Sequence, residues 1–466
     1  AMVTAPAARA SLDATQLEWG SRPAGRSPST RLQAATSPPE QRTPKVRCSI
    51  VEGPLAGRVI EADGHETVLI GRGVRGGLRI AGDGSISRNH CLIELAGQVA
   101  YLRDLGSRNG TLVNGQRVQA TDLHTGDEVR LGRTVIRIEL PAAAPEHAAP
   151  VLRCPRCGAE VPAAEAAWSA ETAGTGATLC AACRTAAAGG GAPEVFEGYK
   201  VERKLAEGGM GTVYVAVQKA TGQRVAIKTL RPDVAQHPDA IPMFLRETAT
   251  QAQLDHPGAV RVLGSGFSRG LFYFAMELVS GPSLEGLVIE RGPLAVDQAL
   301  TVALQVLDVL AYAHGRGLVH RDVKPSNVLM AALPPTPVAR LADFGLMRRF
   351  ESSGFSLLSR TGQRKGTPRY MPPEQVEDSK RVGPAADLYA LGGTLFFALT
   401  GTTPLAFDDA TDPLLTILEG EPRRLASLCP SAGPRLDEVV ARCLAKTPAE
   451  RFASAVELRA ALRAAV

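Results

Sequence analysis

The residues best suited to chemistry in this sequence gather in one short stretch, residues 320–327, which reads His-Arg-Asp-Val-Lys-Pro-Ser-Asn. It sets an acid, a base and an amide at fixed offsets, on Asp322, Lys324 and Asn327. A second acid, Asp343, follows 21 residues after the first. Side chains of these types can accept a proton, neutralise an anion and hold a metal ion. We expect the rest of the chain to be organised around this stretch.

Two features upstream point to phosphate binding. Lys228 ends the apolar run that begins at Val225. A buried lysine without a partner is costly, so anions should surround it. Residues 205–213 read Leu-Ala-Glu-Gly-Gly-Met-Gly-Thr-Val, and glycines let a loop backbone approach phosphate groups closely. A glycine-rich loop alone is a weak signal, and its distance from Lys228 strengthens it.

In this order, the glycine-rich loop, Lys228, the stretch at 320–327 and the Asp-Phe-Gly triplet at 343–345 resemble the signature set of protein kinases. The similarity to bacterial (Hanks-type) protein serine/threonine kinases covers roughly residues 197–466. The pattern departs from the family at Ala206, where the first glycine is usual. We expect this change to affect loop flexibility or nucleotide affinity without abolishing binding.

The resemblance implies an α+β bilobal fold, with an N-lobe at about 197–279 and a C-lobe at about 280–466. It also implies ATP and Mg²⁺ (or Mn²⁺) as cofactors. Residues 272–279 are expected to form the hinge strand behind the adenine pocket. The apolar residues of 299–313 recur at helical spacing and are expected to lead into the catalytic loop.

The resemblance assigns a role to each matching residue. Asp322 would accept the proton of the substrate hydroxyl, and Asn327 and Asp343 would hold Mg²⁺. Lys324 would neutralise the transferring phosphate. The implied catalytic residues are Asp322, Lys324, Asn327, Lys228 and its partner Glu247. The implied nucleotide-binding residues are Ala206, Gly208, Gly211, Val213, Lys228, the gatekeeper Met276, Glu277, Val279, Asn327 and Asp343.

Other family features concern regulation and support. The Asp-x-Lys-x-x-Asn form of the catalytic loop is typical of serine/threonine kinases. In the family, an arginine such as Arg321 often pairs with a phosphate in the activation segment, here residues 343–374. Thr361 is the first candidate for that phosphosite and Thr367 the second. Two supporting interactions are implied, an ion pair of Glu374 with Arg451 and a bracing of the catalytic loop by Asp387.

Residues 46–140 have a different character. Short β-rich runs are separated by turn signals, including Asn114-Gly115, in which both residues tolerate a positive φ. This spacing predicts a β-sandwich of about 95 residues. The expected strands include 47–51, 67–70, 91–95, 99–103 and 134–140.

Three loop motifs sharpen this interpretation. They are Gly-Arg at 71–72, Ser-Arg-Asn-His at 87–90 and Ser-Arg-Asn-Gly-Thr at 107–111. Together with Asn114-Gly115 they resemble a forkhead-associated (FHA) domain, which binds phosphothreonine peptides. A phosphate needs a cation, a short hydroxyl donor and amide donors that converge from loops. The resemblance implies that Arg72 and Ser87 grip the phosphate, that Arg88 and Arg108 border it, that Asn109 holds the peptide backbone, and that His90 and Asn114 stabilise the loops. The alternative is a plain sandwich whose Arg and Ser side chains are solvated.

Four cysteines form two Cys-x-x-Cys pairs with 22 residues between the pairs. The first pair is Cys154 with Cys157, and the second is Cys180 with Cys183. Each pair lets two thiolates from one turn reach one metal ion, and two pairs complete a tetrahedral Zn²⁺ site. We therefore predict a small zinc ribbon at 151–184, between linkers at 141–150 and 185–196. A redox dithiol pair is the alternative, although it would need a βαβ context that is absent here.

Composition limits the remaining choices. A chain of 466 residues suggests about three domains, and residues 1–45 read as a disordered tail. The net charge of +5 argues against a nucleic-acid-binding body. No apolar run reaches the ~18 residues of a spanning helix, and no secretory signal is predicted. Cysteine usage fits a reducing cytoplasm.

The leading interpretation is a multidomain cytoplasmic chain: an all-β FHA sandwich, a zinc ribbon and an active protein serine/threonine kinase. Its expected partners are protein substrates and phosphothreonine proteins, or its own phosphorylated segments, and a transient homodimer is allowed. One rival is a pseudokinase scaffold whose FHA domain binds phosphoproteins. The intact Lys228, Glu247, Asp322, Asn327 and Asp343 argue against it. A kinase of small molecules is a third option, which the full activation segment disfavours.

Overall fold

The computed structural model describes residues 45–63, 67–74, 77–96, 99–141, 152–153, 160–161, 196, 198–208, 211–229, 254–268, 271–344, 368–378, 382–408 and 410–465. Some of the residues singled out above lie outside these ranges. They are Cys154, Cys157, Cys180, Cys183, Glu247, Thr361 and Thr367.

The predicted zinc ribbon is not confirmed. All four of its expected ligands, Cys154, Cys157, Cys180 and Cys183, lie outside the described residues, so their thiolates cannot be placed around one ion. Among the residues that the structure does describe, no group of three or more His, Cys, Asp or Glu side chains could hold a metal ion. The described residues therefore show no site for structural Zn²⁺.

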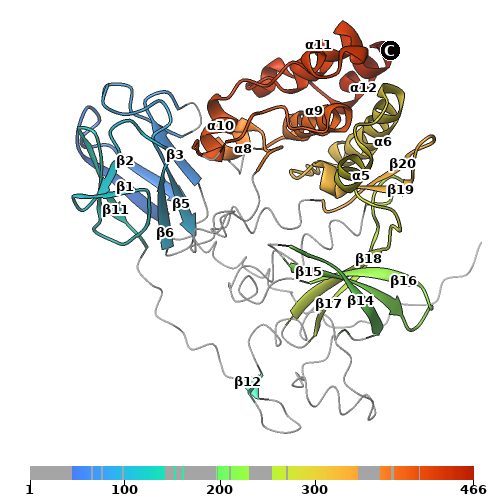
Figure 1. The fold of residues 1–466 in the computed structure, drawn as a ribbon. Helices are drawn as coiled ribbons and strands as arrows, with labels where there is room; N and C mark the ends of the chain where they lie inside the picture. The colour runs from blue at the N-terminus through green and yellow to red at the C-terminus, as the bar shows by residue number, and fades with distance from the viewer. Residues whose placement is uncertain are drawn as a thin grey trace, which may run out of the picture. The chain divides into compact units, whose positions relative to one another are not determined.

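The N-terminal β domain is a sandwich of two sheets, drawn in blue to cyan in Figure 1. One sheet has the order β2-β1-β11-β10-β7-β8, and the other has the order β4-β3-β5-β6-β9. All pairs are antiparallel except β3 with β4. The strands are β1 (Lys45–Glu52), β2 (Val59–Asp63), β3 (Thr67–Gly71), β4 (Leu78–Arg79), β5 (Cys91–Ala96), β6 (Val99–Asp104), β7 (Thr111–Val113), β8 (Gln116–Val118), β9 (Ala120–Leu123), β10 (Glu128–Leu131) and β11 (Thr134–Glu139).

The predicted sandwich and its hairpin are confirmed. Inward-facing side chains from both sheets, such as Ile50, Ile70, Ile93 and Ile136, form one buried core. Val113 pairs with Gln116 across the turn at Asn114-Gly115, whose φ angles are 51° and 81°. Only residues that tolerate a left-handed backbone fit such a turn, which explains the Asn-Gly signal.

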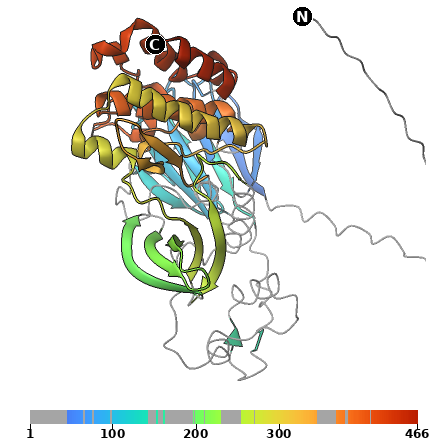
Figure 2. The same ribbon diagram turned by 90° about the vertical axis from the view of Figure 1, so that its right-hand side faces the viewer.

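The N-lobe of the second domain is a five-stranded antiparallel sheet of order β14-β15-β16-β18-β17. Figure 2 shows how strongly this sheet curls. Its strands are β14 (Tyr199–Gly208), β15 (Gly211–Gln218), β16 (Arg224–Thr229), β17 (Val262–Ser268) and β18 (Leu271–Glu277). Phe196 is fully buried in the core of this lobe with Tyr273 and Ile227, so it belongs to the lobe and not to the preceding linker.

The C-lobe is mostly helical. Its helices are α5 (Leu284–Arg291), α6 (Val296–His314), α8 (Pro373–Glu377), α9 (Pro384–Thr400), α10 (Pro413–Glu419), α11 (Gly433–Cys443) and α12 (Ala455–Ala464). A hairpin of β19 (Val328–Ala332) and β20 (Val338–Leu341) follows the 3₁₀ turn η1 (Pro325–Asn327). Short 3₁₀ turns also occur at η3 (Leu425–Ser427), η4 (Pro430–Ala432) and η5 (Pro448–Glu450). Several helices begin at side-chain caps: Ser283 accepts from the amide of Gly286, Asp412 from Leu414 and Ser454 from Glu457.

Two apolar helices form the centre of the C-lobe. Helix α9 is buried from Ala386 to Leu399, and α6 buries nine side chains in the same core. By length and hydropathy α6 alone, among the described helices, would qualify as a membrane span, which the sequence analysis did not identify. Half of its apolar stretch is buried inside the protein. A helix in a protein core can meet the same criteria of length and hydropathy.

Candidate functional site

The catalytic loop between α6 and β19 is held by one buried carboxylate, Asp387 of α9. Its two oxygens accept hydrogen bonds from the backbone amides of His320 (2.8 Å) and Arg321 (2.7 Å). His314, at the end of α6, lies 2.7 Å from the same group through Nε2. Arg321 has a φ of 64°, a strained backbone for a non-glycine residue, and the amide bonds to Asp387 hold it there. The predicted bracing role of Asp387 is therefore present in the structure.

His320 is fully buried and orients the backbone of the loop from inside. Its Nε2 lies 3.0 Å from the carbonyl of Ala342, and its Nδ1 accepts from the amide of Asp322 at 3.2 Å. One nitrogen thus donates and the other accepts, as in the neutral imidazole. Burial lowers the pKa of His320, which favours this neutral form. The ring also packs against Phe344 at 4.5 Å.

The carboxylate of Asp322 is positioned by its two neighbours in the motif. Lys324 Nζ lies 2.8 Å from Asp322 Oδ2, and Asn327 Nδ2 donates to the same oxygen at 3.0 Å. Asn327 Nδ2 also donates to the backbone carbonyl of Asp322 at 2.9 Å. The amide nitrogen of Asn327 thereby locks the loop, so the amide oxygen is the atom with which Asn327 would bind a metal ion.

Lys228 and Asp343 form an ion pair across the two lobes of the kinase-like domain. Lys228 Nζ lies 2.7 Å from Asp343 Oδ2, with the side chains only 13% and 25% exposed. The other carboxylate oxygen, Asp343 Oδ1, is buried and has no hydrogen-bond partner among the described residues. Such an orphaned anionic oxygen is costly and fits a cation ligand. Asp343 also holds a φ of 59°, so its backbone is fixed in an unusual conformation.

Most of the residues predicted to bind nucleotide lie on or next to the N-lobe sheet. Gly208 and Gly211 pair across the β14–β15 turn, and Val213 pairs with Lys228 on β16. Met276 is buried on β18 beside Ala226. The amide of Glu277 donates to the carbonyl of Arg261 at 2.9 Å. Ala206 lies in β14, and Val279 follows directly after β18.

Glu374 and Arg451 form the predicted ion pair. It is bidentate, at 2.6 and 2.7 Å, and the Arg451 side chain has no solvent exposure. Arg451 also donates to backbone carbonyls, including Ala445 at 2.8 Å and Ala385 at 2.9 Å. The guanidinium is thus fully used, and it ties the start of α8 to the end of the domain.

In the β domain, the sequence motifs converge at the loop ends of β3, β5 and β7. We call residues 71–74, 83–90 and 105–110 the recognition loops. Ser87 Oγ accepts from the amide of Arg108 at 3.0 Å, and Asn109 Nδ2 donates to the carbonyl of Ser85 at 2.7 Å. The amide of Arg72 donates to the carbonyl of Ser87 at 3.0 Å. Ser87 is half-buried, whereas Arg72, Arg88, Arg108 and Asn109 are exposed.

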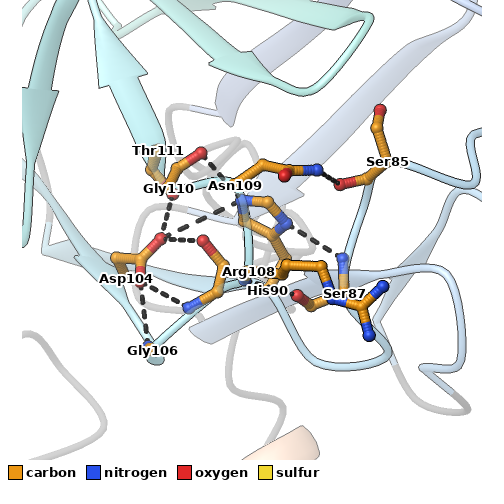
Figure 3. Close-up of polar contacts among 10 residues, drawn as sticks. Ser85, Ser87, His90, Asp104, Gly106, Arg108, Asn109, Gly110 and Thr111 are labelled. Atoms are coloured by element: carbon orange, nitrogen blue, oxygen red, sulfur yellow. Dashed lines mark hydrogen bonds and ion pairs between the residues drawn. The ribbon is translucent and has the colours of Figure 1, made fainter.

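The buried His90 and the half-buried Asp104 stabilise these loops, as Figure 3 shows. His90 accepts from the amide of Ser87 at 3.1 Å and lies 3.3 Å from the carbonyl of Gly110. Burial lowers the pKa of His90, which keeps the ring neutral. Asp104 accepts from Ser107, from Gly106 and from Thr111. Burial alone would raise the pKa of Asp104, but the hydrogen bonds from Ser107 and Thr111 lower it overall.

Sequence reasoning predicted the loop-stabilising role of His90 but missed Asp104, and it missed His314 in the catalytic domain. Asp104 directly precedes the Leu-Gly-Ser-Arg-Asn-Gly stretch, and this position was the available signal. For His314 no local pattern exists, because its partner Asp387 lies 73 residues away. Asn114, which was predicted, binds Asp127 through its side chain at 2.8 Å.

Comparisons with known proteins match both domains. Residues 199–461 match the family model described as a protein kinase domain, and residues 68–132 match the FHA domain model. The chain is 35% identical over 266 residues to serine/threonine-protein kinase PknL of Mycobacterium tuberculosis, covering 57% of this chain and 65% of that protein. It is 37% identical over 265 residues to PkaA of Streptomyces coelicolor, covering 54% of this chain and 47% of that protein.

The chain therefore spans less than two thirds of the length of these curated relatives. Among solved structures, the kinase domain of PknI from M. tuberculosis covers 59% of this chain and 100% of its own length, with 31% identity and a TM-score of 0.47.

Proposed function

Because this chain belongs to the protein kinase family, we propose that it transfers the γ-phosphate of ATP to serine and threonine hydroxyls of proteins. The observation that carries this proposal is the Asp322 carboxylate, held by Lys324 and Asn327 at 2.8 and 3.0 Å. A carboxylate fixed in this way can orient a hydroxyl and accept its proton at the moment of transfer.

The neighbouring residues supply the electrostatics of the reaction. Phosphoryl transfer depends on positioning and on neutralising the charge of three phosphate oxygens. Lys228 would bind the α- and β-phosphates, and Lys324 would face the transferring phosphate. Lys228 pairs with Asp343, which the nucleotide would approach. Lys324 pairs with Asp322, which the protein substrate would approach. Each lysine is therefore already oriented toward the reacting atoms.

The donor set fits Mg²⁺. The orphaned Asp343 Oδ1 and the amide oxygen of Asn327 are hard oxygen ligands, which Mg²⁺ prefers together with phosphate oxygens. When bound, such an ion would supply positive charge that neutralises the charge developing on the transferring phosphate. Both side chains are held in place. Asn327 makes two hydrogen bonds to Asp322, and Asp343 pairs with Lys228.

A first experiment is incubation of the purified chain with labelled ATP and Mg²⁺, followed by analysis of the phosphorylated amino acids. We expect label on serine and threonine and none on tyrosine. Incorporation by a chain of this sequence would exclude the pseudokinase alternative. Label on tyrosine alone would contradict the substrate class.

We further propose that the recognition loops bind phosphothreonine. Ser87 Oγ uses a lone pair for the Arg108 amide, so its proton can point to a phosphate oxygen, and Arg72 is exposed beside it. Arg72→Ala should weaken binding of a phosphothreonine peptide roughly tenfold or more, since a charged hydrogen bond is lost. Arg137→Ala, on the opposite sheet at β11, is the matched control. Equal affinity of both variants would remove Arg72 from the phosphate site.

The zinc ribbon stays a separate proposal, with Cys154, Cys157, Cys180 and Cys183 as the ligands. Supporting it, β12 (Leu152–Arg153) pairs with β13 (Glu160–Val161), so a short hairpin encloses Cys154 and Cys157 in sequence. Hairpins of this kind present two thiolates to one ion. The test is a thiol titration of the native chain before and after chelation.

The other four cysteines should add few reactive thiols to that titration, because three of them are buried. Cys48, Cys91 and Cys443 are buried, and burial raises their pKa, to about 11 for Cys48 and about 12 for Cys443. They should stay unreactive, while Cys429 is partly exposed. Zinc release together with four newly reactive thiols would support the ribbon. A chain without zinc, in which all four predicted ligands react from the start in addition to Cys429, would contradict it.

A further inference from the structure

The sheet of β3, β5 and β6 buries side chains on both of its faces. On one face Ile70, Ile93 and Leu102 belong to the sandwich core. On the other face Leu69 pairs directly with Leu92, and these leucines are 0% and 2% exposed. A sheet with one solvated face alternates apolar and polar residues. The leucines on the second face therefore predict a covering partner.

This second face carries a compact set of residues, which we call the docking face: Leu69, Val74, Leu92, Arg103 and Leu105. Arg103 pairs with Leu92 across β5 and β6, so a cation stands directly beside the apolar row. Val74 and Leu105 are 2% and 0% exposed. All four apolar members fall outside the sandwich core and form a cluster of their own.

The cluster is completed by residues of the kinase C-lobe. Residues 43–466 form one unit, and within it the docking face packs against apolar residues of the segment 371–417. These residues are Met371, Val376, Leu405, Leu414 and Ile417. Leu405 and Ile417 are almost fully buried, at 1% and 0% exposure. The C-lobe thus offers an apolar surface that matches the leucines of the docking face.

Charges match across the same contact. Arg103 forms an ion pair with Asp412, and the two side chains are only 19% and 10% exposed. Asp412 also caps α10 by accepting from the amide of Leu414 at 2.9 Å. Glu419, at the other end of α10, accepts from Arg88 at 2.6 Å and from Asn89 at 3.0 Å. The acids at the two ends of α10, the N-cap Asp412 and the last residue Glu419, therefore pair with the β domain.

Arg88 connects this contact to the recognition loops. It belongs to a recognition loop, adjacent to Ser87, and its guanidinium is bound to a carboxylate of the C-lobe. We propose that the FHA domain docks through Leu69, Leu92 and Arg103 on helices α8 and α10 of its own kinase domain, and that this docking competes with phosphothreonine peptides for Arg88. The competitive part rests on the proposed phosphothreonine-binding function.

The competition works in both directions. If docking lowers the affinity for phosphopeptide, phosphopeptide must weaken docking by the same factor. The docked surface includes Met371 and Val376, which flank Glu374 at the end of the activation segment. A phosphopeptide in the recognition loops would thus release the region of the kinase that directly follows its activation segment.

The test uses Arg103→Glu in the full chain. This change sets a second carboxylate against Asp412 while leaving the recognition loops and the α10 cap intact. Small-angle X-ray scattering should show a larger radius of gyration. Affinity for a phosphothreonine peptide should rise about fivefold or more, the lower end of typical coupling between sites.

Two further variants serve as controls. Adding Asp412→Asn to Arg103→Glu keeps a helix cap and removes the repulsion, so both readouts should return toward wild type. Arg130→Glu, on the other sheet, should change neither readout. An unchanged radius of gyration in Arg103→Glu would refute docking, and a larger radius without a gain in affinity would refute competition. If no variant binds the peptide, the phosphothreonine function fails, while scattering still decides whether the surfaces dock.

Discussion

At the scale of single residues, the chemistry of this chain depends on carboxylates whose surroundings differ sharply. Asp387 is buried and satisfied by backbone amides, so it is structural. Asp322 is held by two side chains, and in the proposed reaction it would orient the substrate hydroxyl. Asp343 keeps one buried oxygen without a hydrogen bond among the described residues, as expected of a metal ligand. Three aspartates thus have three roles that follow from their contacts.

The orphaned oxygen leads to a prediction about metal dependence. Asp343→Asn replaces a charged ligand with a neutral one, so half-saturation of activity should require more Mg²⁺ and the maximal rate should fall. The relevant measurement is phosphate transfer as a function of Mg²⁺ concentration at saturating ATP. Glu290→Gln, at an exposed position of α5, serves as a control. An unchanged Mg²⁺ requirement in Asp343→Asn would assign the metal to other residues.

The buried histidines predict how stability depends on pH. Burial lowers the pKa of both His90 and His320, so the unfolded chain takes up protons that the folded chain resists. Stability is then fully present above the unfolded pKa of about 6.5 and is lost as the pH falls through it. We expect a lower free energy of unfolding at about pH 5.5 than at about pH 7.5 in denaturant titrations.

A variant separates this effect from general acid sensitivity. His90→Gln should be less stable at about pH 7.5 but should lose less stability than wild type on going to about pH 5.5. The Asp83 carboxyl titrates below this interval. Burial would raise its pKa, but hydrogen bonds from Ser85, Thr134 and Arg133 outweigh burial and lower the pKa to about 2. If the variant and wild type lose equal stability over this interval, His90 does not carry the pH dependence.

Much of the site could be predicted from sequence because short motifs fix their residues locally. Asp322, Lys324 and Asn327 lie within six positions, and the turn at η1 lets both Lys324 and Asn327 contact Asp322. The pair of Glu374 with Arg451 was predicted from family resemblance. The pairing of Lys228 with Asp343 was not, because the sequence does not show which of several anions lies nearest to a buried lysine in the absence of nucleotide.

At the scale of elements, the close packing of α9 against its neighbours stabilises the C-lobe. A Cβ atom added at Gly392 would lie 2.5 Å from the Cβ of Cys443 on α11, far inside van der Waals contact. The glycine is therefore required by helix–helix packing. Its neighbour Gly393 would bring a Cβ 3.2 Å from Tyr370, a milder conflict.

Gly392→Ala should accordingly destabilise the chain by about 1–3 kcal/mol, the usual cost of overpacking. Gly286→Ala in α5 is the matched control, because its added Cβ meets only ordinary contacts at 3.5 Å or more. That control should be neutral or stabilising by up to about 1 kcal/mol through reduced freedom of the unfolded chain. Denaturant unfolding of both variants provides the comparison. Equal stabilities would show that α9 and α11 can move apart at little cost.

The Glu374–Arg451 pair gives a second prediction at this scale. Arg451→Met removes a bidentate partner and leaves the Glu374 carboxylate without its cation, which costs about 3–5 kcal/mol for a buried pair. Arg435→Met, at an exposed position of α11, should change stability by less than about 0.5 kcal/mol. Thermal unfolding measures both. A loss of similar size in the two variants would mean that the ion pair contributes little.

The element order itself was largely predictable. Alternation and turn signals predicted strands that lie within β1, β3, β5 and β6, and the 3.6-residue period predicted α6. The docking face was not predicted. Leu69 and Leu92 sit in short apolar runs that look like ordinary strand residues, and only the register of β3 against β5 shows that they share the face away from the core.

At the scale of the whole molecule, a proposed phosphothreonine binder and a kinase are joined in one chain. The family matches cover residues 68–132 and 199–461, so both domains lie in the same polypeptide. If Arg88 is shared between a phosphopeptide and Glu419, the product of a kinase reaction can feed back on the enzyme that made it. Such feedback needs only a local competition for one cation.

Phosphate transfer by the purified chain is the most direct measurement of the central claim. Wild type, Asp322→Asn and Asp297→Asn, an exposed position in the first turn of α6, are compared with labelled ATP and Mg²⁺. Transfer should fall about 10²–10⁴-fold in Asp322→Asn, the range for loss of a general base, and stay near wild type in Asp297→Asn. Nucleotide affinity should be similar in all three. Equal incorporation of label by wild type and Asp322→Asn would contradict the assignment of Asp322 as the catalytic base.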